Sequence, residues 1–246
     1  MISNRAMRSQ DADKLGQLIS ALVNDGQIAD AYALLAPVLA ERTPFRLLDR
    51  IGAAIGVGPV EAVNTFLDHI AAHKTMGGWV VIASALGGQL SRDLPGAFTR
   101  CRKFILDADV WYATDILGER VPGPALVADY TQVLPLLSPW RYDLNRWIRR
   151  TVGVAVHFWA KRAHGEPEYI SQAKALLAFL APMFEEQDMD AIKGVGWGLK
   201  TLGRFYPDLV AEWLTEQVVH LRRNPRILML RKALTYLSDE YRVQLS

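Results

Sequence analysis

Hydrophobic residues recur every three or four positions along almost the whole chain. The first such run, Leu15, Leu18, Ile19, Leu22 and Val23, places its apolar side chains on one face of a helix. Alternating polar and apolar residues, the pattern of a half-buried strand, are nearly missing. The pattern therefore predicts an all-α protein.

Prolines mark the expected beginnings of several helices. Pro59, Pro95, Pro124 and Pro207 each precede an amphipathic run, and proline is well tolerated in the first turn of a helix. Short segments between helices force neighbours to lie antiparallel. We expect helices over residues 10–23, 28–41, 45–56, 59–73, 77–90, 94–106, 109–118, 124–137, 141–163, 167–183, 188–204, 207–221 and 225–237.

Basic residues occupy similar places in three of these helices. Arg150, Lys193 and Lys232 are separated by 43 residues (150 to 193) and 39 residues (193 to 232). This spacing is close to the HEAT and armadillo period of roughly 40 to 47 residues. We therefore expect one domain over residues 1–246, a right-handed superhelical α-solenoid of HEAT-like antiparallel helix pairs, with one helix of each pair lining a concave face.

Composition indicates the cellular location of the protein but does not indicate its function. The chain has 28 Lys and Arg against 26 Asp and Glu, a net charge of +2, so affinity for nucleic acid must come from clustering. Cys101 is the only cysteine, which excludes an intramolecular disulfide and favours a cytoplasmic location. Residues 1–14 lack the apolar core of a secretory signal, and no apolar stretch reaches the length of a membrane span. We expect a monomer with no membrane contact.

Two stretches are rich in arginine. Residues 140–151 interleave arginine with Trp140, Tyr142 and Trp147, and residues 222–232 contain no acidic residue. Cations spaced along repeated helices suit a phosphate backbone, and a helix N-terminus at Asn224 would add backbone donors. The alternative is a solvated face with local salt bridges. The residues expected to bind DNA are Arg146, Arg149, Arg150, Lys193, Arg226 and Arg231.

Two further segments contain candidate site residues. Trp111 and Asp115, four positions apart, share one face of a helix. Trp197 stands among Gly194, Gly196 and Gly198, each of which costs a helix about 1 kcal/mol relative to alanine. Close helix packing is one explanation for these glycines, and unobstructed approach of a ligand past Trp197 is the other.

Segments 111–115, 147–151 and 192–197 resemble, in order and spacing, three motifs of the AlkD family of HEAT-like alkylpurine DNA glycosylases. The resemblance covers residues 76–240, and residues 1–75 match it weakly. It implies a DNA repair enzyme that binds duplex DNA containing alkylated purines and hydrolyses the N-glycosidic bond of N3- and N7-alkylated purines without a cofactor. By resemblance, the catalytic residues are Asp115, Trp111 and Trp197, and Arg150 grips the DNA near the lesion.

The residues leave two other interpretations open. A non-catalytic HEAT-repeat module could use the same arginines to bind DNA or an acidic protein, because repeat folds serve many functions. Asp115 could be an exposed helix carboxylate paired with Arg120 or with a neighbouring turn. Convergence of Trp111, Asp115, Arg150 and Trp197 on one cleft would favour the enzyme.

Metal-dependent chemistry is not expected. His69 and His73 have a spacing that could place two imidazoles on one metal ion, but the sequence offers no third ligand and lacks the glutamate of the zinc-protease motif. The chain also contains no phosphate-binding glycine-rich loop and no serine nucleophile elbow, so nucleotide hydrolysis and acyl transfer are disfavoured.

Overall fold

A computed structural model describes residues 7–245, which form helices and no strand. The all-α prediction is therefore confirmed. Contacts divide the chain into two compact units, an N-terminal unit, Met1–Val121, and a C-terminal unit, Pro122–Ser246. None of the described helices is long and apolar enough to cross a membrane. The single domain over residues 1–246 stays a prediction.

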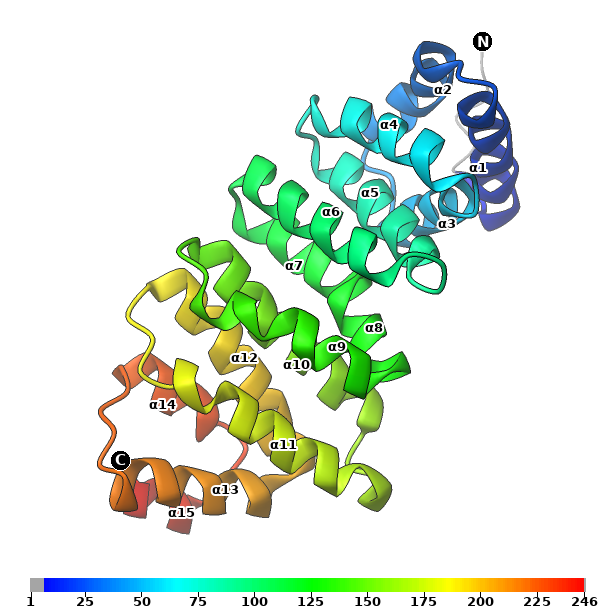
Figure 1. Cartoon of the computed structure of the whole chain (residues 1–246). Coiled ribbons are helices and arrows are strands. Elements are labelled where there is room, and N and C mark those ends of the chain that lie inside the picture. The colour runs from blue at the N-terminus through cyan, green and yellow to red at the C-terminus, as the bar shows by residue number, and fades with distance from the viewer. Residues whose placement is uncertain (1–6, 246) are drawn as a thin grey trace. The chain divides into compact units, whose positions relative to one another are not determined.

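Two layers of helices make up the N-terminal unit (Figure 1). Helices α1, α3, α5 and α7 pack in succession as one layer, and α2, α4 and α6 pack against one another on its other side. Short connections join each helix to the next, as the sequence predicts. The helices are α1 Ser9–Asn24, α2 Ile28–Ala40, α3 Phe45–Gly56, α4 Val60–Ala71, α5 Met76–Gln89, α6 Leu94–Ala108 and α7 Trp111–Arg120.

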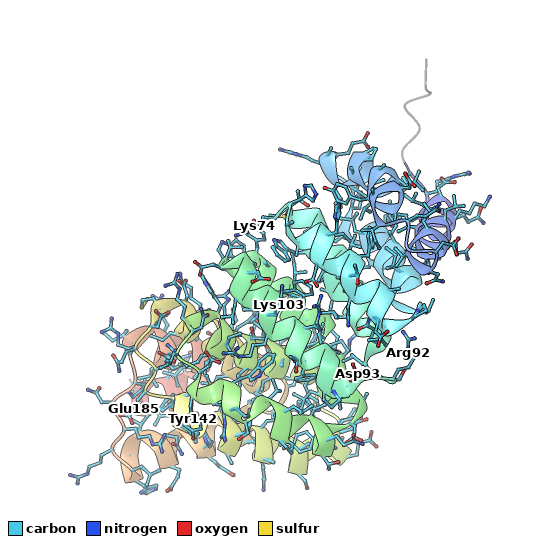
Figure 2. All side chains as sticks on the ribbon, turned by 45° about the horizontal axis from the view of Figure 1, so that its top comes forward. Lys74, Arg92, Asp93, Lys103, Tyr142 and Glu185 are labelled. Atoms are coloured by element: carbon cyan, nitrogen blue, oxygen red, sulfur yellow. The ribbon has the colours of Figure 1, made fainter. Side chains whose placement is uncertain are left out.

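Local polar contacts set the ends of these helices. Asp93 caps α6 by accepting a hydrogen bond from the Gly96 amide at 3.0 Å, and the guanidinium of Arg92 donates to the Gly58 carbonyl beyond the end of α3 at 2.9 Å (Figure 2). Asp109, in the left-handed region with φ of 46°, ends α6. This turn makes Trp111 the first residue of α7.

The C-terminal unit repeats the two-layer arrangement (Figure 1). Helices α8, α10, α12 and α14 pack in succession, while α11 packs on α13 and α13 on α15. The α-helices are α8 Pro122–Ala128, α9 Tyr130–Leu137, α10 Arg146–Ala163, α11 Ile170–Leu180, α12 Met189–Phe205, α13 Pro207–Thr215, α14 Ile227–Ala233 and α15 Asp239–Leu245. Shorter segments are the 3-10 turns η1 Pro139–Tyr142, η2 Pro167–Tyr169 and η3 Ala181–Met183, and the π-helix η4 Glu216–His220.

Several predicted helices differ in detail: those expected over 167–183 and 207–221 are α-helical only over Ile170–Leu180 and Pro207–Thr215, with 3-10 or π segments beside them, and three others differ more. The helix expected over 124–137 is split into α8 and α9, because Asp129 accepts a hydrogen bond from the Gln132 amide and starts a new helix. The helix expected over 141–163 begins only at Arg146, because Asn145 caps it through the Trp147 amide. The helix expected over 225–237 spans Ile227–Ala233, and α15 was not predicted.

Candidate functional site

The exposed side of α12 is cationic and carries one tryptophan. Between Ala191 and Gly203 every residue is buried except Lys193, Trp197 and Lys200, and Arg204 follows on the exposed surface. These four residues are spaced by four, three and four positions, so they lie along one face of the helix. The solvent-facing stripe of α12 therefore presents three positive charges and an indole.

Cations from α10 and α14 lie close to this stripe. Burial lowers the pKa of Lys232 below its ordinary value, and the charges of Lys200, Arg150, Arg231 and Lys193 lower it further. Lys232 therefore lies within electrostatic range of four other cations, which come from α10, α12 and α14. Repulsion of this kind is relieved when an anion such as a phosphate binds. We call Arg150, Lys193, Lys200, Arg231 and Lys232 the basic cluster.

Glycine 196 makes room for the basic cluster. A Cβ atom at this position would lie only 2.5 Å from Cδ of Lys232. The aliphatic part of Lys232 thus runs directly over the α12 backbone, where any side chain at Gly196 would displace it. This close approach explains why Lys232 is half-buried and why its pKa is depressed.

Glycines also bring α10 and α12 together. A Cβ atom on Gly194 would lie 2.5 Å from the Arg150 carbonyl oxygen, and one on Gly198 would lie 2.8 Å from that of Gly153. Gly153 itself faces the backbone of Gly194 and Val195. Close helix packing is therefore the explanation for Gly194 and Gly198, rather than a path for a ligand.

Arg150 and Trp197 each make a contact across this crossing. Arg150 is 6% exposed, and its Nη1 donates a hydrogen bond to the Asp190 carbonyl at 3.0 Å. Trp197 is half-buried, and its ring stacks on His157 of α10 with a centroid separation of 3.8 Å and an interplanar angle of 24°. The segments expected to form one site in this unit therefore lie on adjacent helices.

Two of the predicted DNA-binding arginines are engaged by carboxylates. Arg149 pairs with Glu186 at 2.6 Å and donates to the Asp143 carbonyl at 2.7 Å, and this pair raises the pKa of Arg149. The Arg149 and Glu186 side chains are only 17% and 10% exposed. Arg146 lies 3.6 Å from Asp190, which also pairs with Lys193 at 3.3 Å. Arg149 thus ties the loop before α10 to the loop before α12.

The loop before α14 differs from its prediction. Helix α14 begins at Ile227, with Arg226 exposed at the N-cap position, so Asn224 lies outside the helix. The Asn224 amide donates to Glu185 at 2.9 Å (Glu185 is labelled in Figure 2). The phosphate site expected at Asn224 is therefore occupied by a carboxylate of the protein, and Arg231 alone of the predicted residues in this stretch belongs to the basic cluster.

Trp111 and Asp115 belong to the N-terminal unit. Trp111 is 56% exposed at the start of α7, and its ring meets that of Tyr112 edge to face at 5.9 Å. Asp115 is partly exposed one turn later. The four motif residues are thus divided, with Trp111 and Asp115 on the N-terminal unit and Arg150 and Trp197 on the C-terminal unit.

A polar network anchors the end of α7. Arg120 forms a two-bonded ion pair with Asp49 of α3, with Nε to Oδ1 at 2.6 Å and Nη2 to Oδ2 at 3.2 Å. Ser84 of α5 donates to the same carboxylate at 2.7 Å. The helix that carries Trp111 and Asp115 is therefore tied to α3 by an ion pair in which α5 also takes part.

The histidine pair of the N-terminal unit packs against an aromatic ring. His73 stacks on Tyr32 with ring centroids 4.2 Å apart, and the His69 and His73 rings are 5.6 Å apart. Within the described chain, no three His, Cys, Asp or Glu residues are grouped so that they could hold a metal ion.

Comparison with known proteins gives the family. The model of the family described as DNA alkylation repair enzyme matches residues 80–237, which include both motif residues of α7 and the whole basic cluster. The chain belongs to this family. No curated protein and no solved structure matches the chain.

Membership of the DNA alkylation repair family indicates what the protein acts on. The family acts in DNA repair, so DNA is the substrate, and the match begins at Val80 within α5. Sequence reasoning did not assign Lys200, Arg204 or His157 to the site. Lys200 and Arg204 follow Lys193 and Trp197 at helical spacing, so the sequence does contain a signal for these two residues. His157 had no such signal, because its role depends on a contact between two helices.

Proposed function

We propose that this family member is a DNA glycosylase that binds duplex DNA in a cationic groove and hydrolyses the N-glycosidic bond of N3- and N7-alkylated purines. The basic cluster beside Trp197 is the observation that carries the proposal. The right-handed superhelical sense of the HEAT-like pairs is part of the same proposal. We further propose that the protein works as a monomer in the cytoplasm.

DNA binding is supported by the charge of the basic cluster and by the half-buried Trp197 beside it. The cations gathered around Lys232 would bind a phosphate backbone with release of counterions, so affinity should fall steeply with salt. Lys193, Lys200 and Arg231 reach the surface, whereas Arg150 is buried against α12 and orders the crossing. Lys193 and Lys200 are therefore the stronger candidates for direct phosphate contacts.

The chemistry needs few groups. An alkylated purine already carries a positive charge and leaves as a neutral base, so no general acid is required. Charge then builds on the deoxyribose, where a fixed carboxylate stabilises it, and Asp115 has the position in the motif for that role. The same carboxylate can orient the attacking water. Trp111 and Trp197 present electron-rich faces that attract a cationic sugar more strongly as the bond breaks.

The test is single-turnover release of N7-methylguanine from duplex DNA with enzyme in excess, so that differences in affinity drop out. Asp115→Asn should slow release by roughly 10-fold to 1000-fold, equivalent to about 1.4 to 4 kcal/mol of transition-state stabilisation. Glu119→Gln removes the other carboxylate of α7 and is the matched control, which should keep the wild-type rate.

Binding is measured separately by fluorescence anisotropy across a salt series. Lys200→Ala should weaken binding to any duplex and reduce the salt slope by about 1, whereas Lys174→Ala on α11 should change neither. Equal release by the Asp115 variant and wild type would refute the catalytic role. Salt-dependent binding without base release would identify a non-catalytic DNA-binding module. Binding indifferent to salt and to Lys200 would leave an acidic protein as the partner.

A further inference from the structure

His157 stands directly behind Trp197. It belongs to α10, is only 7% exposed, and lies with its ring nearly parallel to the indole at a centroid separation of 3.8 Å. A separation this short means that one face of the Trp197 indole is covered by the imidazole. Because Trp197 as a whole is half-buried, part of it still reaches solvent. The stack therefore gives Trp197 a covered side and an open side.

Thr201 joins the stack through two hydrogen bonds. Its hydroxyl lies 2.7 Å from Nδ1 of His157 and donates to the Trp197 carbonyl at 2.9 Å. A hydroxyl has a single hydrogen, so when it donates to the carbonyl it must accept from the histidine. Nδ1 is then the nitrogen that carries the proton. The ring of His157 is thus fixed in orientation and in tautomer by the helix that carries Trp197.

The same ring is uncharged at neutral pH. Burial, together with the positive charge of Lys161 one turn further along α10, lowers the pKa of His157 to about 4. A cation on the covered face of Trp197 would weaken the cation–π attraction between the open face and a positive charge. A neutral imidazole packs against the indole without weakening this attraction.

We propose that His157 is a positioning residue, which holds the Trp197 indole in the orientation that faces DNA and keeps positive charge off its covered side. The inference rests on the proposed function for its catalytic readout. The glycine crossing builds the arrangement into the fold, because a Cβ atom on Gly198 would lie 2.8 Å from the Gly153 carbonyl and 3.4 Å from Cβ of Val156. The close approach of the two helices at Gly198 brings the rings of His157 and Trp197 within stacking distance.

Three variants separate the parts of the arrangement. His157→Leu replaces the imidazole with an apolar side chain that has no ring. His157→Phe keeps a neutral ring but removes Nδ1, and Thr201→Val removes the hydroxyl at similar shape. Val152→Ala, a fully buried side chain of the same helix, controls for lost core volume. Because His157→Phe and Thr201→Val are conservative, the inference stays testable if the leucine variant does not fold.

The catalytic readout is single-turnover base release together with the dissociation constant for duplex DNA. His157→Leu should slow release by about 10-fold with affinity changed less than about 3-fold, because misplacement of a contacting group affects the reacting geometry most. His157→Phe should recover most of the rate. In the background of Trp197→Ala, His157→Leu should cause no further loss. An equal additional loss in that background would show a general structural role and overturn the proposal.

A second readout does not depend on catalysis. The fluorescence of Trp197 is obtained as the difference between each protein and its Trp197→Phe counterpart, and its quenching by acrylamide reports access to the indole. We expect quenching about 2-fold stronger in His157→Leu, near wild type in His157→Phe, and unchanged in Val152→Ala. If the wild type releases no base, the proposed function fails while this measurement still decides the inference. Quenching that is the same in His157→Leu and wild type would overturn it.

Discussion

The crossing of α10 and α12 predicts opposite effects for alanine at two glycines of one helix. At Gly194 a methyl group would lie 2.5 Å from the Arg150 carbonyl oxygen and 2.6 Å from its Cγ, against an ordinary contact of about 3.4 to 4 Å. At Gly203 the nearest atom, the Ala233 carbonyl oxygen, would be 3.4 Å away. Gly194→Ala therefore forces the helices apart, and Gly203→Ala does not.

The magnitudes follow from two opposing terms. Alanine gains up to about 1 kcal/mol over glycine in a helix interior. A methyl group forced into a packed interface costs about 1 to 3 kcal/mol, and the obstacle at Gly194 includes backbone, which has no rotamer to change. We expect Gly194→Ala to lower the free energy of unfolding by about 1 to 2 kcal/mol and Gly203→Ala to raise it by up to about 1 kcal/mol.

Urea unfolding followed by helical circular dichroism measures both changes, with the slope against urea as a check that the same cooperative transition is compared. Gly153→Ala, which faces the backbone of Gly194 and Val195, should be at least as damaging as Gly194→Ala. The crossing also sets the distance between Arg150 and Trp197, so Gly194→Ala should weaken DNA binding and Gly203→Ala should not. Equal or higher stability of Gly194→Ala than of Gly203→Ala would refute the close crossing.

Two further predictions concern the C-terminal unit. Arg149→Ala should destabilise the protein by about 2 to 4 kcal/mol, because it leaves the nearly buried Glu186 carboxylate without its ion-pair partner, and the double variant Arg149→Met with Glu186→Leu should recover part of that loss. An Arg149→Ala protein as stable as wild type in urea would contradict this prediction. The pKa of His157 is depressed to about 4, so as the pH is lowered the unfolded chain binds a proton at this residue before the folded chain does, and the free energy of unfolding should fall between about pH 6.5 and pH 4 and level off below pH 4. Thermal unfolding across this pH range should show this part of the fall in wild type and not in His157→Phe. An identical profile in both proteins would refute the depressed pKa.

The sequence predicts the helices well where a proline marks the first turn and less well where a capping side chain sets the start of the helix. Pro95 and Pro207 lie in the first turns of α6 and α13, as expected. Asp129 was not recognised as a cap, because a run of apolar residues continues on both sides of it. The difference depends on the hydrogen bond that the Gln132 amide donates to the Asp129 carboxylate, which competes with continuation of the helix.

The candidate site was only partly readable for a related reason. The repeat spacing of Arg150, Lys193 and Lys232 predicted three cations that the C-terminal unit does bring together. The same reasoning treated Arg149 like Arg150, yet Arg149 is bound by Glu186, which lies 37 residues further along the chain. Periodicity gives the face of a residue, whereas pairing depends on which acidic residue the neighbouring helix supplies.

The distribution of acidic residues explains how a chain of net charge +2 can present a basic face. Carboxylates accompany arginines at structural positions, as in the pairs of Asp49 with Arg120 and Glu186 with Arg149. From Ala191 to Tyr206 the sequence contains no acidic residue. The basic cluster therefore arises because acidic residues are missing from α12 after Asp190, which pairs with Lys193. A phosphate backbone that approaches Lys200 meets cationic side chains of α12 and α14. An acidic side chain introduced at Lys200 should for this reason weaken DNA binding more than the loss of the lysine alone.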